Sequence, residues 1–368
     1  MVPVRSPIPA IYGLPELQAH LDALTQDASM LPDARLLDQV GLQLTEENTP
    51  PLIPILLPPI IHLLKTTTTT SPSPSPSQDP TPLLLLAVKL MTPLSLAQAL
   101  AMADDDDDDD DDDDTSSILT ALRSPLPGAN LIGLTVLAKA SASPDDAAEL
   151  ADLPAVVVQF ITCWLESLDV GVAELAASVL ESVLQTDAQP FDAGHDDGLN
   201  GQVESCRRRR LWHLIFHQPS TLHVIQRYCT VGPIPSRSIH DVTISQGRLL
   251  RLLPRLAPID FASLTTTAVS DMPEAAAQPA GRGLLQWAAL AMVDKSDTLM
   301  NLTLVDFFEA LVQNMRQSPY ALHPTLKNLV KAAVRHDAAV QEALRILPDS
   351  KGEEEEPELT SYLDNLLS

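Results

Sequence analysis

Three histidines in one stretch come closest to the residue types and spacing of a metal site. His213 and His217 stand four residues apart, on one face of a predicted helix, and His223 follows nearby. Zinc sites need three or four ligands, and no cysteine or carboxylate joins these histidines at a known spacing. We therefore interpret them as surface or core-edge residues, and we expect neither a metal nor another cofactor.

Signatures of catalysis are missing from the sequence. It contains no glycine-rich phosphate loop, no Gly-x-Ser-x-Gly nucleophile turn and no His-Glu-x-x-His pair. Cys163, Cys206 and Cys229 are widely spaced and form no Cys-x-x-Cys pair, so neither a disulfide framework nor a zinc site is indicated. We predict a protein that is not an enzyme, with reduced thiols as in the cytoplasm or nucleus.

A stripe of arginines is the candidate partner-binding site. Arg248, Arg251 and Arg255 are spaced to lie on one side of a predicted helix, with leucines on its inner side. In an acidic chain such a stripe is a candidate docking surface. Ordinary solvated arginines are the alternative interpretation.

A second basic feature is a run of four arginines. It has the composition of a nuclear-localisation signal, and its other interpretations are a solvated helix start or a nucleic-acid contact. The run comprises Arg207, Arg208, Arg209 and Arg210.

The charge balance constrains the class of partner. The chain carries a net charge of −26, and an unbroken run from Asp104 to Asp114 contributes part of it. So acidic a protein repels phosphate backbones, which argues against direct nucleic-acid binding. The apolar stretch from Pro82 to Met102 is long enough for a membrane span, but Lys89 and Pro93 interrupt it, so we expect no membrane partner.

The elements that must position these residues are helices. Aromatic residues make up only 4% of the chain, and Leu and Ala dominate the apolar fraction, which favours helices over strands. Pro154 to Gln185 is the clearest segment, because its apolar residues recur at helical spacing in two successive blocks. The first block is Val157, Phe160, Ile161, Trp164 and Leu168. Pro154 suits a first helical turn and Asp169 can cap the second helix, so the two should form a hairpin.

This hairpin pattern recurs along the chain. Helical pairs are predicted to start near Pro154, Ser205, Ile244, Arg282 and Leu322. A period of about 40 residues with two helices per unit is typical of HEAT or armadillo-like repeats. The predicted fold is therefore all-α, an α-solenoid of stacked helical hairpins. Earlier helices are expected near Leu14–Thr25, Ala34–Leu44, Leu83–Met102 and Asn130–Ala140.

Composition divides the chain into six predicted segments. Threonine and Ser-Pro repeats, and then the aspartate run, interrupt otherwise helical sequence. The segments are an N-terminal helical region at 1–65, a disordered Thr/Ser/Pro insertion at 66–81, a helical segment at 82–103, a disordered Asp run at 104–114, a helical-repeat region at 115–350, and an acidic linker with a short tail helix at 351–368.

Several segments together resemble one family. The segments Leu153–Asp187, Leu211–Cys229, Gly247–Phe261 and Gly283–Val312 are similar, in order, to repeats of the proteasome base-assembly chaperones, the 26S proteasome non-ATPase regulatory subunit 5 type. The resemblance covers roughly Leu131 to Leu347. It is greatest to the fungal branch, which is often labelled a DNA mismatch repair protein.

The resemblance implies a function that spacing alone does not. A member of this family would be an α-solenoid chaperone that binds the C-terminal domain of a proteasomal base ATPase during assembly of the regulatory particle. We expect a monomer in the cytoplasm and nucleus. The alternative is a nuclear adaptor associated with DNA mismatch repair or transport, which the family label and the run of four arginines would favour.

Overall fold

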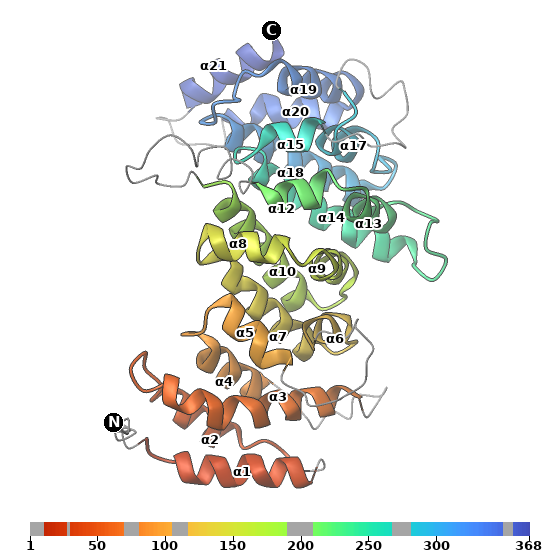
Figure 1. Ribbon diagram of the computed structural model, residues 1–368. Coiled ribbons are helices and arrows are strands. Elements are labelled where there is room, and N and C mark those ends of the chain that lie inside the picture. The colour runs from red at the N-terminus through yellow and green to blue at the C-terminus, as the bar shows by residue number, and fades with distance from the viewer. Residues whose placement is uncertain are drawn as a thin grey trace, which may run out of the picture. The chain divides into compact units, whose positions relative to one another are not determined.

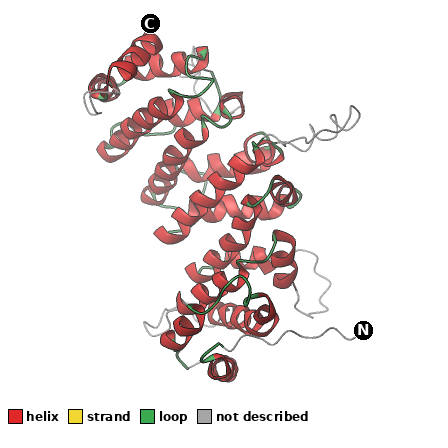
Figure 2. Cartoon of the chain, turned by 90° about the vertical axis from the view of Figure 1, so that its left-hand side faces the viewer, coloured by secondary structure: helices red, strands yellow, loops and turns green. Residues whose placement is uncertain are grey.

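The computed structural model describes seven stretches of the chain. They are residues 11–27, 30–69, 81–104, 117–189, 209–266, 281–348 and 356–368. All regular structure in these stretches is helical, with no strand (Figure 2). The predicted all-α class is confirmed.

The chain forms two compact units. One comprises Met1–Leu150 and Asp169–Val179, and the other comprises Ala151–Leu168 and Leu180–Ser368. The region predicted as one repeat array at 115–350 is therefore divided between them. Among the described residues, no single helix is long and apolar enough to cross a membrane. The consecutive helices at Pro144–Ala151 and Pro154–Glu166 have the required length and composition only together, and they are bent by 94°.

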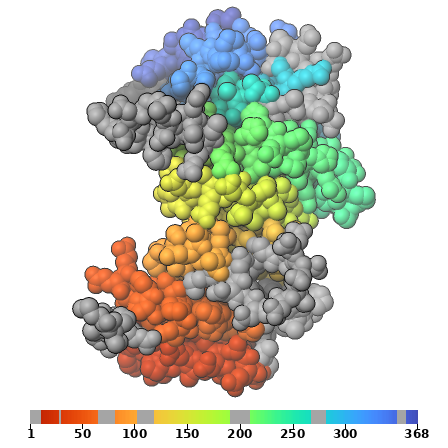
Figure 3. Space-filling model, viewed as in Figure 1, coloured from red at the N-terminus to blue at the C-terminus, as the bar shows by residue number. Residues whose placement is uncertain are grey.

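The described residues of the first unit before α9 (Pro154–Glu166) contain ten helical elements. They are α1 (Leu14–Gln26), α2 (Ala34–Gly41), the short 3-10 helix η1 (Pro50–Leu52), α3 (Ile53–Thr69), α4 (Thr81–Met91), α5 (Leu96–Asp104), α6 (Ser117–Arg123), α7 (Pro127–Ala138), the 3-10 helix η2 (Lys139–Ser141) and α8 (Pro144–Ala151). Helix α3 packs against α1, α4 and α7, and α4 also contacts α2 and α7. The red and orange helices of this unit lie in close contact in Figure 3.

Helix α3 contains two prolines in its interior. Pro58 and Pro59 lie inside this helix. It persists because Leu56, Ile60 and Leu63 recur at helical spacing and are buried. Burial of such an apolar face outweighs the loss of backbone hydrogen bonds at proline.

The helix bounds differ from two expectations in this unit. The insertion predicted at 66–81 has helical ends, because α3 continues to Thr69 and α4 begins at Thr81; residues 70–80 lie outside the described residues. Threonine lowers helix propensity only modestly, so a helix anchored by buried leucines extends into the run. The single helix expected at Leu83–Met102 is two helices, α4 and α5, because Pro93 lacks an N–H and disfavours helix at the residue before it. Of the Asp run, residues 105–114 also lie outside the described residues.

The second unit contains the predicted helical pairs. Its helices are α9 (Pro154–Glu166), α10 (Val170–Asp187, shared with the first unit), α12 (Arg210–Phe216), α13 (Pro219–Cys229), α14 (Ile239–Leu256), α15 (Phe261–Thr266), α17 (Leu284–Leu290), α18 (Thr298–Met315), α19 (Pro324–His336), α20 (Ala338–Ile346) and α21 (Glu356–Leu367) (Figure 1). Four of the five predicted pair starts lie within five residues of the starts of α9, α14, α17 and α19. The fifth, Ser205, lies outside the described residues, and α12 begins at Arg210. The tail helix expected at 351–368 corresponds to α21.

The helices of this unit form two rows. One row runs α9, α13, α14, α18 and α20, and the other runs α12, α15, α17 and α19, each helix contacting the next. In the α12–α13 pair the first helix lies in the second row and the second helix in the first row. The α14–α15 pair has the opposite order, because α14 follows α13 in the same row. The connection before α14 contains Gly232 with φ of 103° and Pro233 and Pro235, which turn the chain back into the row it has just left. The predicted regular repeat of about 40 residues did not include this inversion.

Local signals at the first hairpin were interpreted correctly, with one exception. Pro154 lies in the first turn of α9, and the Asp169 carboxylate accepts a hydrogen bond of 2.9 Å from the Val172 N–H. Phe160 and its neighbours on the predicted face are buried. Leu168 was expected on that face but is largely exposed, because α9 ends at Glu166 and the chain no longer follows the helical spacing.

Candidate protein-interaction site

The first turns of α14 join several helix ends in the second unit. The buried Ser245 hydroxyl donates to the Leu165 carbonyl at 2.6 Å. The buried Gln246 amide donates to the Cys229 carbonyl at 2.8 Å and to the Met292 carbonyl at 2.9 Å. Each bond satisfies a carbonyl at or near a helix end, where the helix itself provides no N–H donor for it. The ends of α9, α13 and α17 are therefore held around α14.

The connection between α13 and α14 is fixed by a second set of contacts. The Arg237 guanidinium donates to the Tyr228 carbonyl at 3.1 Å and to the Ser245 hydroxyl at 2.9 Å, and it stands 4.8 Å from the centre of the Tyr228 ring. The Tyr228 hydroxyl donates to Glu166 at 3.2 Å. A capping box of Ser238 and Asp241 starts α14. The side chains of this connection thus bind it to the end of α13 and the start of α14.

Five large apolar side chains that lie near these helix ends along the chain are exposed. Their exposed fractions range from 56% to 72%. They are Leu168 after α9, Val231 after α13, Ile239 at the start of α14, and Leu299 and Leu302 in the first turns of α18. We refer to these five residues as the apolar edge. Exposed apolar side chains mark a protein-binding surface where they form one contiguous patch.

The predicted arginine stripe lies on α14, and its members make contacts within the chain. Arg248 donates to the Trp164 carbonyl at 2.8 Å and to the Ser167 carbonyl at 2.5 Å, so it caps the end of α9. Arg255 forms an ion pair with Glu181, with 3.1 Å between its Nε and the Oε1. Arg251 is exposed between them. The partner-binding role of the three residues stays a prediction.

The run of four arginines is only half described. Arg207 and Arg208 lie outside the described residues. Arg209 adopts a left-handed backbone conformation with φ of 59° and donates to the buried Asp260 carboxylate at 2.8 Å, while Arg210 forms an ion pair with Asp152. Both described members therefore help to join elements of the second unit, and a localisation role for the run remains untested.

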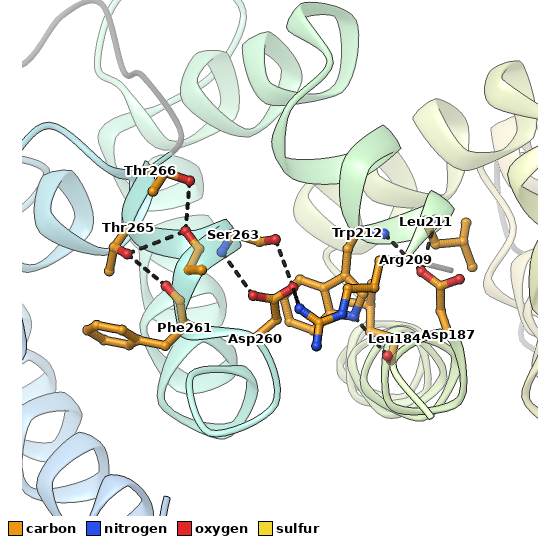
Figure 4. Close-up of polar contacts among 11 residues, drawn as sticks. Leu184, Asp187, Arg209, Leu211, Trp212, Asp260, Phe261, Ser263, Thr265 and Thr266 are labelled. Carbon is orange, nitrogen blue, oxygen red and sulfur yellow. Dashed lines mark hydrogen bonds and ion pairs between the residues drawn. The ribbon is translucent and has the colours of Figure 1, made fainter. Parts of the chain in front are cut away.

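Two buried carboxylates that sequence reasoning missed organise this region (Figure 4). The Asp187 carboxylate accepts hydrogen bonds from the Leu211 and Trp212 N–H groups at 3.0 and 3.1 Å, so it caps α12 from the end of α10. Burial raises the pKa of Asp187, and these two hydrogen bonds oppose that rise. No local pattern marks this cap, because its partners stand more than twenty residues away.

Asp260 is the second buried carboxylate. It accepts from the Ser263 N–H at 3.0 Å and from the Ser263 hydroxyl at 2.9 Å, in addition to Arg209 (Figure 4). The first of these bonds places it at the start of α15. Asp260 precedes Ser263 by three residues, which is the spacing of an N-cap residue and the N–H from which it accepts. This signal, unlike the Asp187 cap, is present in the local sequence.

The histidines and cysteines considered in the sequence analysis form no metal site in the described stretches. His213 and His217 are both exposed, with ring centroids 5.5 Å apart, and the described residues contain no group of three His, Cys, Asp or Glu that could hold a metal ion. Cys163 and Cys229 are buried, and burial raises their pKa to about 11 and about 12. Cys206 lies outside the described residues.

A shallow hollow of about 570 Å³ lies between the α18–α19 connection and α21. Its lining includes Arg316, Leu322, Glu358 and Tyr362, with neither histidine nor cysteine among the lining residues. The Tyr362 hydroxyl donates to the Ala321 carbonyl at 3.0 Å, which binds α21 to this connection.

Comparison with known proteins finds no neighbour: no family model, curated protein or solved structure matches the chain.

Proposed function

We propose that this protein is a non-enzymatic chaperone that binds the C-terminal domain of a proteasomal base ATPase and assists assembly of the regulatory particle. The partner is suggested by the resemblance of the segments from Leu153 to Val312 to the base-assembly chaperones. The observation that carries a protein-binding role is the apolar edge, where five large apolar side chains are exposed near, along the chain, helix ends fixed by hydrogen bonds.

The architecture we propose is a HEAT or armadillo-like α-solenoid in the second unit. Its support is the succession of helical pairs and the two rows that they form. Paired helices of this kind bury their apolar faces only against neighbouring pairs. The inversion at α14–α15 is a departure from a regular repeat, and it brings the start of α14 to the joined helix ends.

In the proposed mechanism the apolar edge covers a surface of the ATPase until other subunits compete for it. Burying large apolar side chains is favourable by about 1.5–3 kcal/mol each when the burial is complete. A few such contacts give reversible binding, as an assembly factor that later leaves its client requires. Because the helix ends are already fixed, little ordering is needed when the partner binds.

The test is affinity purification under native conditions followed by mass spectrometry. The test variant carries Leu299→Asp and Leu302→Asp, and the control carries Leu42→Asp and Leu85→Asp. The control leucines are matched in exposure, at 71% and 59% against 72% and 56%. We expect the wild type and the control to recover a proteasomal base ATPase and the test variant to lose most of it, since two interface residues contribute about 10-fold or more to affinity.

Failure to recover any base ATPase with the wild type would contradict the proposed partner. Equal recovery with all three proteins would contradict the apolar edge as the binding surface. Recovery of mismatch-repair or transport factors in place of the ATPase would favour the adaptor alternative.

A further inference from the structure

Helix α19 has an unusual charge for this chain. The protein carries a net charge of −26, yet α19 contains three cationic side chains and no aspartate or glutamate. Lys327, Lys331 and Arg335 recur at intervals of four residues, which places neighbours about 5–6 Å apart along one side of the helix. We call these three residues the basic row.

The basic row lies away from the packed face of the helix. The buried residues of α19 are Leu326, Leu329, Val330 and Ala333. Arg335 is exposed, and Lys327 and Lys331 are partly exposed, as long cationic side chains are when their stems lie along the protein and their charges remain in water.

Within the described residues, none of these three side chains forms an ion pair or a hydrogen bond. The acidic residues Glu358 and Asp364 of α21 do not pair with them, although α21 packs on α19. The arginine stripe differs in this respect, because Arg248 and Arg255 are bound within the chain.

The dipole of α19 does not account for the row. A cation is stabilised near the C-terminal end of its own helix, where Arg335 lies. Lys327 stands near the opposite end, where the dipole disfavours a positive charge. A requirement of the helix itself therefore explains at most one of the three residues.

We propose that the basic row is a docking site for an acidic helical segment of a partner protein. Carboxylates repeated at every fourth residue of a partner helix would match the spacing of the three cations. A nucleic acid is disfavoured, because the strongly negative remainder of the chain repels a phosphate backbone. The proposal rests on the protein-binding role proposed above but not on the identity of the ATPase.

The test measures binding of a labelled model helix to the full chain. The probe is a fluorescein-labelled, alanine-rich 16-residue peptide with glutamate at every fourth position. A control peptide has the same composition in a permuted order. Fluorescence anisotropy is recorded at about 0.01 M ionic strength, where exposed charges are screened over about 30 Å, and again at about 0.15 M, where the screening length is about 8 Å.

The test variant carries Lys327→Glu, Lys331→Glu and Arg335→Glu. The matched control carries Arg35→Glu, Arg227→Glu and Arg282→Glu, which change the net charge equally at three separate exposed positions. We expect the test variant to bind the probe at least about 10-fold more weakly than the control variant at low salt, and the permuted peptide to bind the wild type more weakly than the probe. The difference should shrink at the higher ionic strength.

Equal loss of binding in both variants would overturn the proposal, because it would show a response to net charge alone. Tighter binding of a 20-nucleotide single-stranded DNA than of the probe would overturn it in favour of a nucleic-acid surface. If circular dichroism shows that the test variant is unfolded, Lys327→Gln, Lys331→Gln and Arg335→Gln are used, with the same expected order. This assay contains no ATPase and leaves the apolar edge unchanged, so its failure is separate from failure of the proposed function.

Discussion

Replacing Asp187 by alanine removes the acceptor that holds the start of α12. Its carboxylate accepts hydrogen bonds from two backbone N–H groups whose residues, Leu211 and Trp212, are fully buried. Water cannot easily replace the lost acceptor there. Loss of a helix cap costs about 0.5–2 kcal/mol, and a buried group left unsatisfied costs about 1–3 kcal/mol. Because these two costs overlap, we expect the free energy of unfolding to fall by about 2–4 kcal/mol.

Thermal denaturation followed by circular dichroism measures this loss. For a unit of this size, 1 kcal/mol shifts the midpoint by about 2–4 °C, so Asp187→Ala should melt roughly 4–16 °C below the wild type. Asp187→Asn keeps one acceptor oxygen and should lose less. Asp306→Ala, at an exposed position on α18, is the control and should melt with the wild type. A midpoint for Asp187→Ala within 1 °C of that control would refute the reasoning.

The same residue predicts a pH dependence. Burial raises the pKa of Asp187 above that of the unfolded chain, so the folded state holds the proton to higher pH. The stabilisation from protonation is therefore complete below the ordinary carboxyl pKa of about 4 and is lost as pH rises through the folded-state value. The stability of the wild type relative to Asp187→Asn should fall as pH rises above about 4. A relative stability that rises over that range would contradict the sign.

Three further outcomes are expected. Arg248→Ala should lower the free energy of unfolding by about 2 kcal/mol in urea denaturation, because two charged hydrogen bonds to the end of α9 are lost; an unchanged midpoint would count against this cap. In a Cys206→Ser variant, Cys163 and Cys229 should react with Ellman's reagent at pH 8 only after unfolding, because burial raises their pKa to about 11 and about 12; fast reaction of the native protein would contradict this. Gly283→Ala should destabilise the protein by about 1–3 kcal/mol, because its Cβ would lie 2.4 Å from a backbone carbonyl oxygen of α15, and a melting midpoint equal to the wild type would contradict this.

The sequence predicted those features that depend on neighbours along the chain. Helical spacing placed Phe160 and Trp164 in the core, and Asp169 was expected to cap the helix that follows it, where it accepts from the Val172 N–H. Such signals act within one or two helical turns, so they can be recognised in the sequence without knowledge of the fold.

Features that depend on distant partners were not predictable in this way. Asp187 caps a helix that begins after a long intervening segment, and Arg248 binds carbonyls of a helix more than eighty residues earlier. The spacing that placed Arg248 in a stripe was correct, but spacing cannot show which cations find partners in the folded chain. The same pattern in α19 was not singled out, although its side chains have no such partners among the described residues.

We propose that the apolar edge binds a proteasomal base ATPase, and direct titration of purified proteins tests this binding most closely. Isothermal titration calorimetry would measure binding of the full chain to the isolated C-terminal domain of each base ATPase. We predict that one of these domains binds, that Leu299→Asp with Leu302→Asp weakens this binding about 10-fold or more, and that Leu42→Asp with Leu85→Asp leaves it unchanged. Absence of binding to every domain, or equal binding by both variants, would contradict the claim.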